Sequence, residues 1–317
     1  MIKTVFFGSP QLAVPFLNQL VLHDEITVLA VVTQPDKPMG RSGKPHPSPI
    51  AAAAELYDIP VLKPERLKKA VVQKELLRFD ADVYVVVAYG KILPKDVLTH
   101  PPFGTINMHP SLLPHSRGPT PMRSAILHGE TETGISIMKM DEEMDHGPIL
   151  SQLRLDISDP HVDAQSLEET VTYLGPKLLI ETLLNYTSGN LTPIPQDDKH
   201  ASYTHLLSRD SGVIDWANMS ALQIDRMVRA YRPWPGVSTV WDNGKNARTL
   251  KILRTDLGPN ALLRRSGVVF ERDGRVFVST KKGSLELKEL QLAGAKPLSA
   301  QEFLKGHPTF IGARLGQ

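Results

Sequence analysis

Apolar residues in the first half of the chain fall into short runs that alternate between two spacings. Residues 2–8 form an apolar run that ends at a Gly-Ser-Pro turn, as a buried strand does, and residues 12–22 carry apolar side chains at helical spacing. Residues 26–33 and 82–88 form further apolar runs. Strands that alternate with helices in this way predict an α/β fold with a doubly wound, mostly parallel, Rossmann-like sheet.

The pattern changes toward the end of the chain. Residues 221–230 have the spacing of one helix, and from Val237 onward short alternating segments are separated by turns such as Asn243-Gly244 and Asp273-Gly274. This pattern predicts a second, smaller domain, an OB-like β-barrel. Residues 188–198 have the composition of a linker. We therefore expect one domain over residues 1–187, a linker over residues 188–205 and the barrel domain over residues 206–317.

Composition excludes several kinds of chemistry. The 317 residues are 41% hydrophobic and 22% charged, as in ordinary globular proteins, and they include no cysteine. Thiol nucleophiles, disulfides and cysteine-based zinc sites are therefore excluded. Three histidines near the polar loops lack fixed metal-ligand spacing, so no metal is expected. Without an apolar segment of spanning length, we expect a cytoplasmic monomer with no membrane partner.

The net charge of +2 conceals an asymmetry. Residues 191–317 hold 19 Lys and Arg against 12 Asp and Glu, whereas residues 1–190 hold 17 against 22. The balance is therefore +7 for the second part and −5 for the first. A basic part of this kind indicates a polyanionic partner. Charge alone leaves a solvated basic surface without function as an equal alternative.

The strongest candidate chemistry lies at the end of an apolar run over residues 103–109. Asn107 and His109 are two residues apart, so in a strand both side chains point to one face. An amide donor beside an imidazole suits a carbonyl oxygen that becomes negative during attack. Asp145, in the polar loop 140–147, is the best candidate to orient the imidazole. A hydrogen-bonded loop histidine without catalytic function is the alternative.

A long loop forms the second candidate. Proline and glycine recur throughout residues 34–49, which argues against any helix or strand there. Its charges besides Asp36 are Lys37, Arg41 and Lys44. Long loops inside compact domains are more often functional than not, and a basic loop could grip phosphate or nucleic acid. A loop without function is the alternative.

Several of these motifs together resemble one enzyme family. Asn107-x-His109-x-Ser-Leu-Leu-Pro114, followed by Arg117-Gly118 and the acidic loop 140–147, is similar to the formyltransferases that use 10-formyltetrahydrofolate. The similarity covers essentially the whole chain. It implies one-carbon formyl transfer without a metal, with Asn107, His109 and Asp145 as catalytic residues. It also implies that the acceptor is the amino group of methionine on initiator tRNA, for translation initiation.

The resemblance further implies which residues bind the two substrates. Those expected to contact the folate are Ser111, Leu112, Leu113, Pro114, Val87, Tyr89, Gly90 and Ile92. Those expected to bind tRNA are Lys37, Arg41, Lys44 and Arg209, with Arg41 the key residue. Under this interpretation, the first domain binds folate and catalyses transfer, and the basic barrel domain binds tRNA.

Some positions depart from the family pattern, and two related activities stay open. Glu143, His146 and Pro148 stand where members often have Gly, Thr and Asp, and Leu206 stands where a lysine is often found. A sugar-nucleotide amine N-formyltransferase would need neither the basic loop nor the basic domain. A formyltetrahydrofolate hydrolase would share the same catalytic residues. A tRNA-binding protein without catalysis is less compatible with the intact catalytic residues.

Overall fold

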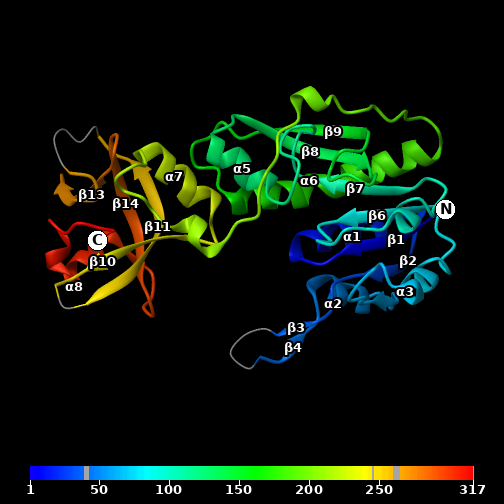
Figure 1. Cartoon of the computed structure of the whole chain (residues 1–317), viewed down its shortest axis with the longest axis horizontal. Helices are drawn as coiled ribbons and strands as arrows, with labels where there is room; N and C mark the ends of the chain where they lie inside the picture. The colour runs from blue at the N-terminus through cyan, green and yellow to red at the C-terminus, as the bar shows by residue number, and fades with distance from the viewer. Residues whose placement is uncertain (39–42, 245, 260–264, 317) are drawn as a thin grey trace. The chain divides into compact units, whose positions relative to one another are not determined.

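The chain divides into two compact units in a computed structural model that describes residues 1–38, 43–244, 246–259 and 265–316 (Figure 1). The first unit comprises Met1–Pro121, Glu132–Asp156 and Glu168–Thr204. The second comprises Met122–Thr131, Ile157–Leu167 and His205–Gln317. The expected linker was residues 188–205, and residues 188–204 of it belong to the first unit.

The first unit is built on a seven-stranded sheet in the order β5-β2-β1-β6-β7-β8-β9. The first five of these strands pair in parallel, whereas β8 is antiparallel to both β7 and β9. This arrangement confirms the mostly parallel sheet. The strand bounds are Ile2–Gly8 (β1), Ile26–Val32 (β2), Val61–Leu62 (β5), Val83–Val87 (β6), Thr105–His109 (β7), Glu132–Lys139 (β8) and Ile149–Asp156 (β9).

Short helices connect the parallel strands. Helix α2 begins where Ser48 accepts a hydrogen bond from Ala51 N at 3.1 Å, with Pro49 as its first residue. Strand β6 is buried throughout, as expected of a parallel strand covered on both faces. The helix bounds are Val14–Val21 (α1), Pro49–Glu55 (α2), Ala70–Leu76 (α3), Lys95–Leu98 (α4), Pro121–His128 (α5) and Ala164–Thr187 (α6).

The loop over residues 34–49 contains a small ladder that the sequence argument excluded. Lys37–Pro38 (β3) pairs antiparallel with Pro45–His46 (β4). The exclusion of any helix or strand was therefore wrong for these four residues and for Pro49, which begins α2. Proline has no N–H to donate to a neighbouring strand. It is tolerated here because each strand of this two-stranded ladder has one edge that needs no hydrogen bond. Arg41 lies outside the described residues.

The second unit contains the predicted small β domain. Its antiparallel sheet runs in the order β10-β11-β14-β13-β12, and β15 pairs with β14. The predicted helix over residues 221–230 is confirmed as Ala221–Ala230 (α7). The remaining bounds are Val237–Asp242 (β10), Ala247–Leu257 (β11), Val269–Arg272 (β12), Arg275–Ser279 (β13), Ser284–Leu292 (β14), Leu298–Ser299 (β15) and Ala300–Gly306 (α8).

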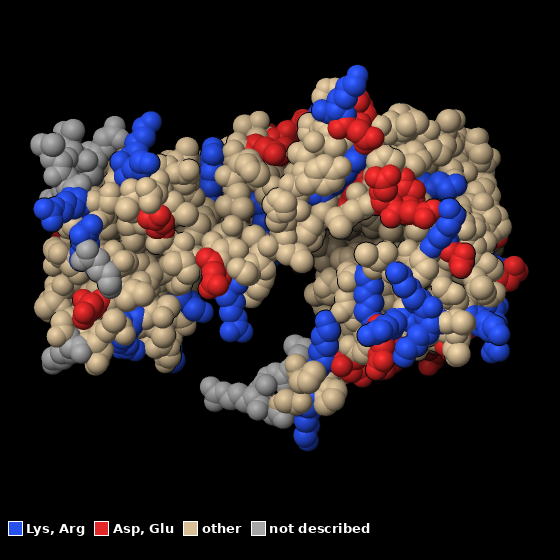
Figure 2. Space-filling view, in the orientation of Figure 1, with Lys and Arg blue, Asp and Glu red and all other residues tan. Residues whose placement is uncertain are grey.

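An aromatic cluster closes the core of this unit. The Trp241 ring lies 5.5 Å from Phe303 and 5.1 Å from Phe310, centroid to centroid, in edge-on geometry. On the face shown in Figure 2, blue Lys and Arg side chains outnumber red Asp and Glu over this unit. No helix among the described residues is both long and apolar enough to cross a membrane.

Candidate active site

Asn107 and His109 lie at the carboxyl end of β7, in the middle of the sheet. Asn107 is paired with Val86 of β6, and His109 with Ser136 of β8. Because side chains alternate along a strand, both point to the same face, as the sequence predicted. Their exposed fractions are 8% and 4%. Ligands of open α/β sheets bind at this end of the parallel strands.

The His109 ring is held between two oxygen acceptors. Its Nε2 lies 3.1 Å from Ser116 O, and its Nδ1 lies 3.6 Å from Asp145 Oδ2. A carbonyl oxygen can only accept, so Nε2 carries the hydrogen of that bond. The distance to Asp145 exceeds a hydrogen bond, which leaves the carboxylate as a charged neighbour of Nδ1. The structure thus brings Asp145 to His109 across 36 residues of sequence.

The Asn107 side chain, unlike the His109 ring, has no hydrogen-bond partner in the described structure. Among the residues that the structure describes, none forms a hydrogen bond with its side chain, although the residue is almost completely buried. Its amide atoms are not among the fully buried side-chain atoms without a partner, so they retain some access to solvent. An amide in this position is therefore suited to take its partner from a ligand.

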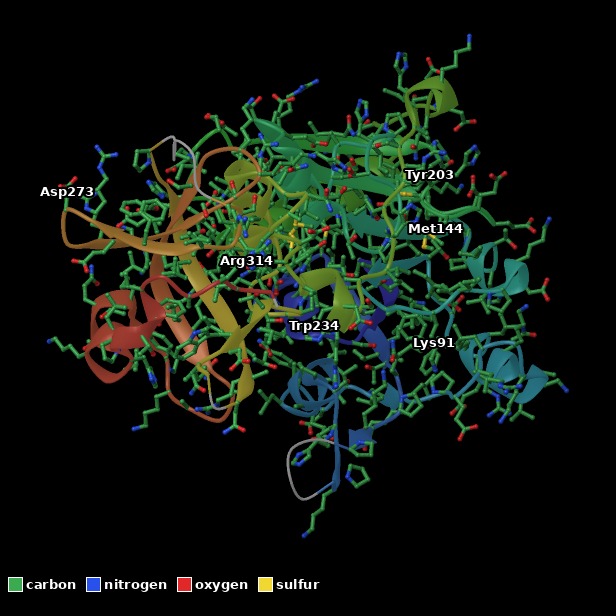
Figure 3. All side chains as sticks on the ribbon, turned by 60° about the vertical axis from the view of Figure 1, so that its left-hand side comes forward. Lys91, Met144, Tyr203, Trp234, Asp273 and Arg314 are labelled. Carbon is green, nitrogen blue, oxygen red and sulfur yellow. The ribbon has the colours of Figure 1, made fainter. Side chains whose placement is uncertain are left out.

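The loop that carries Asp145 has an uncommon backbone. Asp145 has φ 51°, in the left-handed region that favours glycine. A Cβ on Gly147 would lie 1.9 Å from Lys139 O, so only glycine fits there. The Asp145 carboxylate accepts a hydrogen bond from Gly118 N at 2.7 Å. Met144 marks this loop in Figure 3.

His146, one of the departures from the family pattern, is bound to acidic residues. Its Nδ1 lies 2.6 Å from Asp141 Oδ2, and its Nε2 lies 3.5 Å from Asp198 Oδ2. The hydrogen bond to Asp141 raises the pKa of His146 above its ordinary value; burial opposes this, and the charges of Asp141, Glu143 and Asp198 add to it.

Arg117, which follows the predicted folate-binding segment, is buried. The residue is 1% exposed, and its guanidinium donates to Gln196 Oε1, Asp198 Oδ1 and Tyr203 Oη at distances from 2.8 to 3.2 Å. The hydrogen bond from Arg117 is the main reason that the pKa of Asp198 is lowered. Gln196 and Asp198 were missed because residues 188–205 read as a linker. The only feature of the sequence that could have indicated a functional role for them is the polar cluster Gln196-Asp197-Asp198, which lies between prolines and a lysine.

The segment expected to contact folate is partly buried. Ser111 and Leu113 are 2% and 3% exposed, while Leu112 and Pro114 are half-buried. Ser136 fixes the segment, because its Oγ donates to Ser111 O at 2.6 Å and accepts from Leu113 N at 3.0 Å. This places the segment beside His109, whose partner in β8 is the same serine.

The other residues expected to contact folate differ in exposure: two are buried and two are exposed. Val87 and Tyr89 are buried, and Tyr89 belongs to the hydrophobic core, where its hydroxyl lacks a partner among the described atoms. Burial raises the pKa of Tyr89 to about 12. These two residues can therefore offer a ligand only backbone atoms. Gly90 (φ 74°) and Ile92, which is 80% exposed, lie at the surface.

The residues expected to bind tRNA are exposed wherever they are described. Lys37 Nζ donates to Gln34 Oε1 at 2.7 Å. Lys44 and Arg209 are exposed, and Arg209 begins the 3-10 helix Arg209–Gly212. No group of three or more His, Asp or Glu side chains arranged to hold a metal occurs within the described part of the chain.

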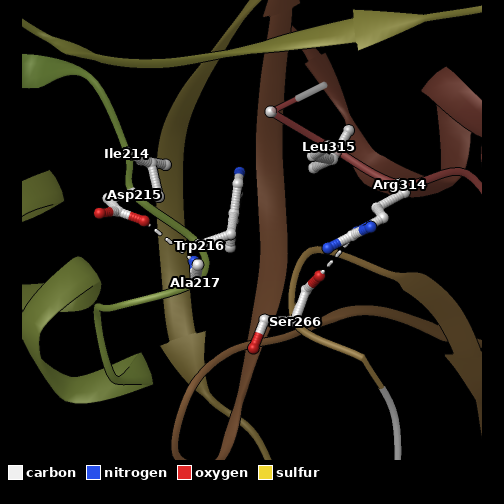
Figure 4. A pocket seen from close by; sticks show the side chains of 8 residues that line it. Ile214, Asp215, Trp216, Ala217, Ser266, Arg314 and Leu315 are labelled. Atoms are coloured by element: carbon white, nitrogen blue, oxygen red, sulfur yellow. Dashed lines mark hydrogen bonds between the residues drawn. The ribbon is translucent and has the colours of Figure 1, made fainter.

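A separate cavity of about 290 Å³ lies in the second unit beside Trp216 (Figure 4). Several of its polar groups have partners: Arg314 Nε donates to Ser266 O at 3.3 Å, Asp215 Oδ1 accepts from Ala217 N at 3.1 Å, and Trp216 Nε1 donates to Thr239 Oγ1 at 2.9 Å. None of the residues expected from the sequence to act in catalysis or binding lines this cavity.

The chain is similar to known proteins over its whole length. Residues 2–183 match the family model described as formyl transferase, and residues 206–308 match the formyl transferase C-terminal domain. The chain is 42% identical over 315 residues to a protein of Roseiflexus castenholzii named methionyl-tRNA formyltransferase, with 99% of each chain covered. It is 40% identical over 316 residues, again with 99% of each covered, to a protein of the same name from Geobacter metallireducens.

Solved structures share the fold at lower identity. An N-formyltransferase from Helicobacter canadensis, in complex with folinic acid and dTDP-3-aminofucose, aligns over 94% of this chain and 100% of its own with a TM-score of 0.65 and 17% identity. HypX from Aquifex aeolicus, in complex with tetrahydrofolic acid, aligns over 98% of this chain and 48% of its own with a TM-score of 0.62 and 16% identity. The sequence comparisons, at about 40% identity over the whole length, show that the chain belongs to the methionyl-tRNA formyltransferase family.

Proposed function

We propose that this protein transfers the formyl group of 10-formyltetrahydrofolate to the α-amino group of methionine on initiator tRNA, for the initiation of protein synthesis. The name and full-length identity of its relatives support this proposal. The observation that carries it within the structure is the Asn107 amide, which has no hydrogen-bond partner among the described residues and lies on the same face of β7 as His109. We further propose that the protein acts as a cytoplasmic monomer.

10-Formyltetrahydrofolate supplies an activated formyl carbonyl when it is bound. The unpaired Asn107 amide provides a donor for that carbonyl, and Gly90 and Ile92 are exposed after the carboxyl end of β6. The residues that would hold the folate are Ser111, Leu112, Leu113 and Pro114, with Gly90, Ile92 and the backbone of Val87 and Tyr89. The site fits the cosubstrate on these grounds.

Asn107 and His109 act on the carbonyl oxygen as it becomes negative. The Asn107 amide donates a hydrogen bond that strengthens as charge develops. Because Nε2 of His109 is bonded to Ser116 O, Nδ1 is the nitrogen left to face the reaction and Asp145. The Asp145 carboxylate stabilises positive charge on the ring through its proximity. The amine attacks the formyl carbon and gives a proton to a nearby water. The bond from that carbon to the folate nitrogen would then break, and tetrahydrofolate would leave with a proton from solvent on that nitrogen.

The basic loop and the second unit hold the tRNA acceptor. The residues proposed to contact its phosphates are Lys37, Arg41, Lys44 and Arg209. Their positive charges would neutralise the phosphates, which uncharged hydrogen-bond donors cannot do. The positive balance of residues 191–317 supports a polyanionic substrate. A sugar-nucleotide acceptor carries only two phosphates and would not require this charge.

An acceptor panel tests the proposal. Purified protein would be given 10-formyltetrahydrofolate with initiator methionyl-tRNA, with elongator methionyl-tRNA, with a dTDP-linked amino sugar, or with no acceptor. We expect formylation of the initiator tRNA to be the fastest reaction. Faster formylation of the amino sugar, or equally fast release of formate without acceptor, would contradict the proposal.

A further inference from the structure

The side chain of Gln196 uses all of its hydrogen-bonding capacity around the Asp145 loop. Its Nε2 donates to Asp145 O at 2.9 Å and to Gly147 O at 2.7 Å. Its Oε1 accepts from Arg117 Nε at 3.1 Å and from Arg117 Nη2 at 2.8 Å. An amide has two donor hydrogens and two lone pairs, so no capacity remains.

Arg117 connects Gln196 back to the catalytic residues. On one side of Arg117, Ser116 O accepts the hydrogen bond from His109 Nε2. On its other side, Gly118 N donates to the Asp145 carboxylate. A closed ring of contacts therefore runs from the Asp145 carbonyl through Gln196, Arg117 and Gly118 to the Asp145 carboxylate. Arg117 is buried and Gln196 and Asp145 are half-buried, and charge-assisted networks of this kind restrict the positions of their members.

This ring acts on a residue in an unfavourable conformation. The left-handed backbone of Asp145 costs about 1–2 kcal/mol relative to the common regions. Gln196 Nε2 donates hydrogen bonds to the carbonyl oxygens of Asp145 and Gly147. These hydrogen bonds stabilise the loop with Asp145 in its left-handed conformation. We propose that Gln196 is a positioning residue that sets the orientation of Asp145 toward His109. This inference rests on the proposed function of that pair.

Anchoring of the linker does not depend on Gln196. Arg117 also donates to Asp198 and Tyr203, and Ser116 N donates to Ser202 Oγ at 2.8 Å. Thr204 N donates to Arg117 O at 2.8 Å. The segment therefore stays attached when the Gln196 amide is removed, which separates a positioning role from a purely structural one.

Two substitutions test the inference, with a matched control. Gln196→Met removes both donors and acceptors, whereas Gln196→Glu keeps acceptors for Arg117 and removes only the donors. We expect each to lower kcat about ten- to a hundredfold, with KM for both substrates within about twofold of wild type and a similar urea midpoint. The control is Gln291→Met, which removes a single amide hydrogen bond to Ala295 O in the second unit and should leave kcat unchanged.

A double-mutant cycle identifies the residue through which Gln196 acts. In an Asp145→Asn background, Gln196→Met should lower kcat by less than about twofold further, because its target is already lost. Effects that multiply, or an unchanged kcat in Gln196→Met itself, would overturn the inference. If Asp145→Asn alone leaves kcat unchanged, the proposed function of the pair fails instead.

A measurement without substrate tests the positioning role of Gln196 separately from the proposed formyl-transfer function. The ¹⁵N resonances of the His109 ring, assigned by their loss in His109→Gln, report the environment of Nδ1. We expect Gln196→Met to shift the Nδ1 resonance and Gln291→Met to leave it in place. An unshifted Nδ1 resonance would overturn the positioning role even if the protein proved to transfer formyl groups to another acceptor.

Discussion

The side chains of His109 and Asp145 are held by groups from other parts of the chain. His109 faces Ser116 O with one nitrogen and Asp145 with the other, and Asp145 is in turn bound by Gly118 N. Since these partners belong to two different loops, the histidine keeps one orientation only while both loops keep their conformation.

His146 makes the stability of the Asp145 loop depend on pH. Its pKa is raised above 6.5 in the folded protein by the hydrogen bond to Asp141. A raised pKa adds stability fully below the unfolded value, and this contribution is lost as pH rises through the folded value. We expect His146→Gln to lower the free energy of unfolding at pH 5.5 by about 0.5 kcal/mol or less, given the partial exposure of the pair.

Urea unfolding of wild type and His146→Gln at pH 5.5, 7.0 and 8.5 measures this effect. The difference between the two proteins should shrink as pH rises. A difference that grows toward pH 8.5 would show that the contacts of His146 with Asp141 and Asp198 do not stabilise the fold through its positive charge.

Among the elements, the loop after β8 depends on one glycine. A Cβ on Gly147 would overlap Lys139 O at 1.9 Å. Backbone cannot move aside as a flexible side chain can, so Gly147→Ala should destabilise the protein by about 1–3 kcal/mol and lower kcat. Gly306→Ala, at the end of α8 with no atom within 4 Å of its Cβ, should be neutral or slightly stabilising. Equal unfolding midpoints for the two variants would refute this reading of the loop.

The loop over residues 34–49 should act on one substrate only. We expect Arg41→Leu to raise KM for charged tRNA at least about tenfold and KM for the folate less than twofold, because a phosphate contact serves the polyanion alone. Steady-state kinetics with each substrate varied in turn measures both constants. Similar increases in the two would mean that the loop shapes the folate site instead.

At the scale of strands and turns, some features could be predicted from the sequence and others could not. The shared face of Asn107 and His109 follows from strand periodicity, which is local, and it was predicted correctly. The inward direction of Tyr89 was not, because the turn after β6 passes through left-handed backbone at Ala88 and Gly90, and periodicity does not carry through such a turn. The contact of Arg117 with Gln196 joins residues 79 apart, and no local pattern reports it.

For the whole molecule, charge is the feature most directly tied to the acceptor. The net charge of residues 191–317 is +7, and each neutralised phosphate releases counterions. We therefore expect the Kd for tRNA to rise about a hundredfold or more between about 50 and 200 mM salt, while the Kd for folate changes little. A similar, shallow dependence for both ligands would show that the basic residues do not contact the tRNA backbone.

The full chain is the correct material for that experiment. Truncation at residue 190 would remove Gln196, Asp198, Tyr203 and Thr204, which contact the loops around Asp145 and Arg117. Loss of activity in such a fragment would then report damage to the catalytic site as well as loss of tRNA binding. Neutralising substitutions in the intact protein avoid this confusion.

The central claim is that the buried pair Asn107 and His109 stabilises charge that is present only during formyl transfer. Single-turnover formylation of initiator methionyl-tRNA tests it most directly, with Asn107→Ala and His109→Ala compared with Asn185→Ala on the exposed face of α6. We predict that the first two each lower the rate about a hundred- to a thousandfold with folate affinity nearly unchanged, and that the third does neither. A near-normal rate in either Asn107→Ala or His109→Ala would contradict the account.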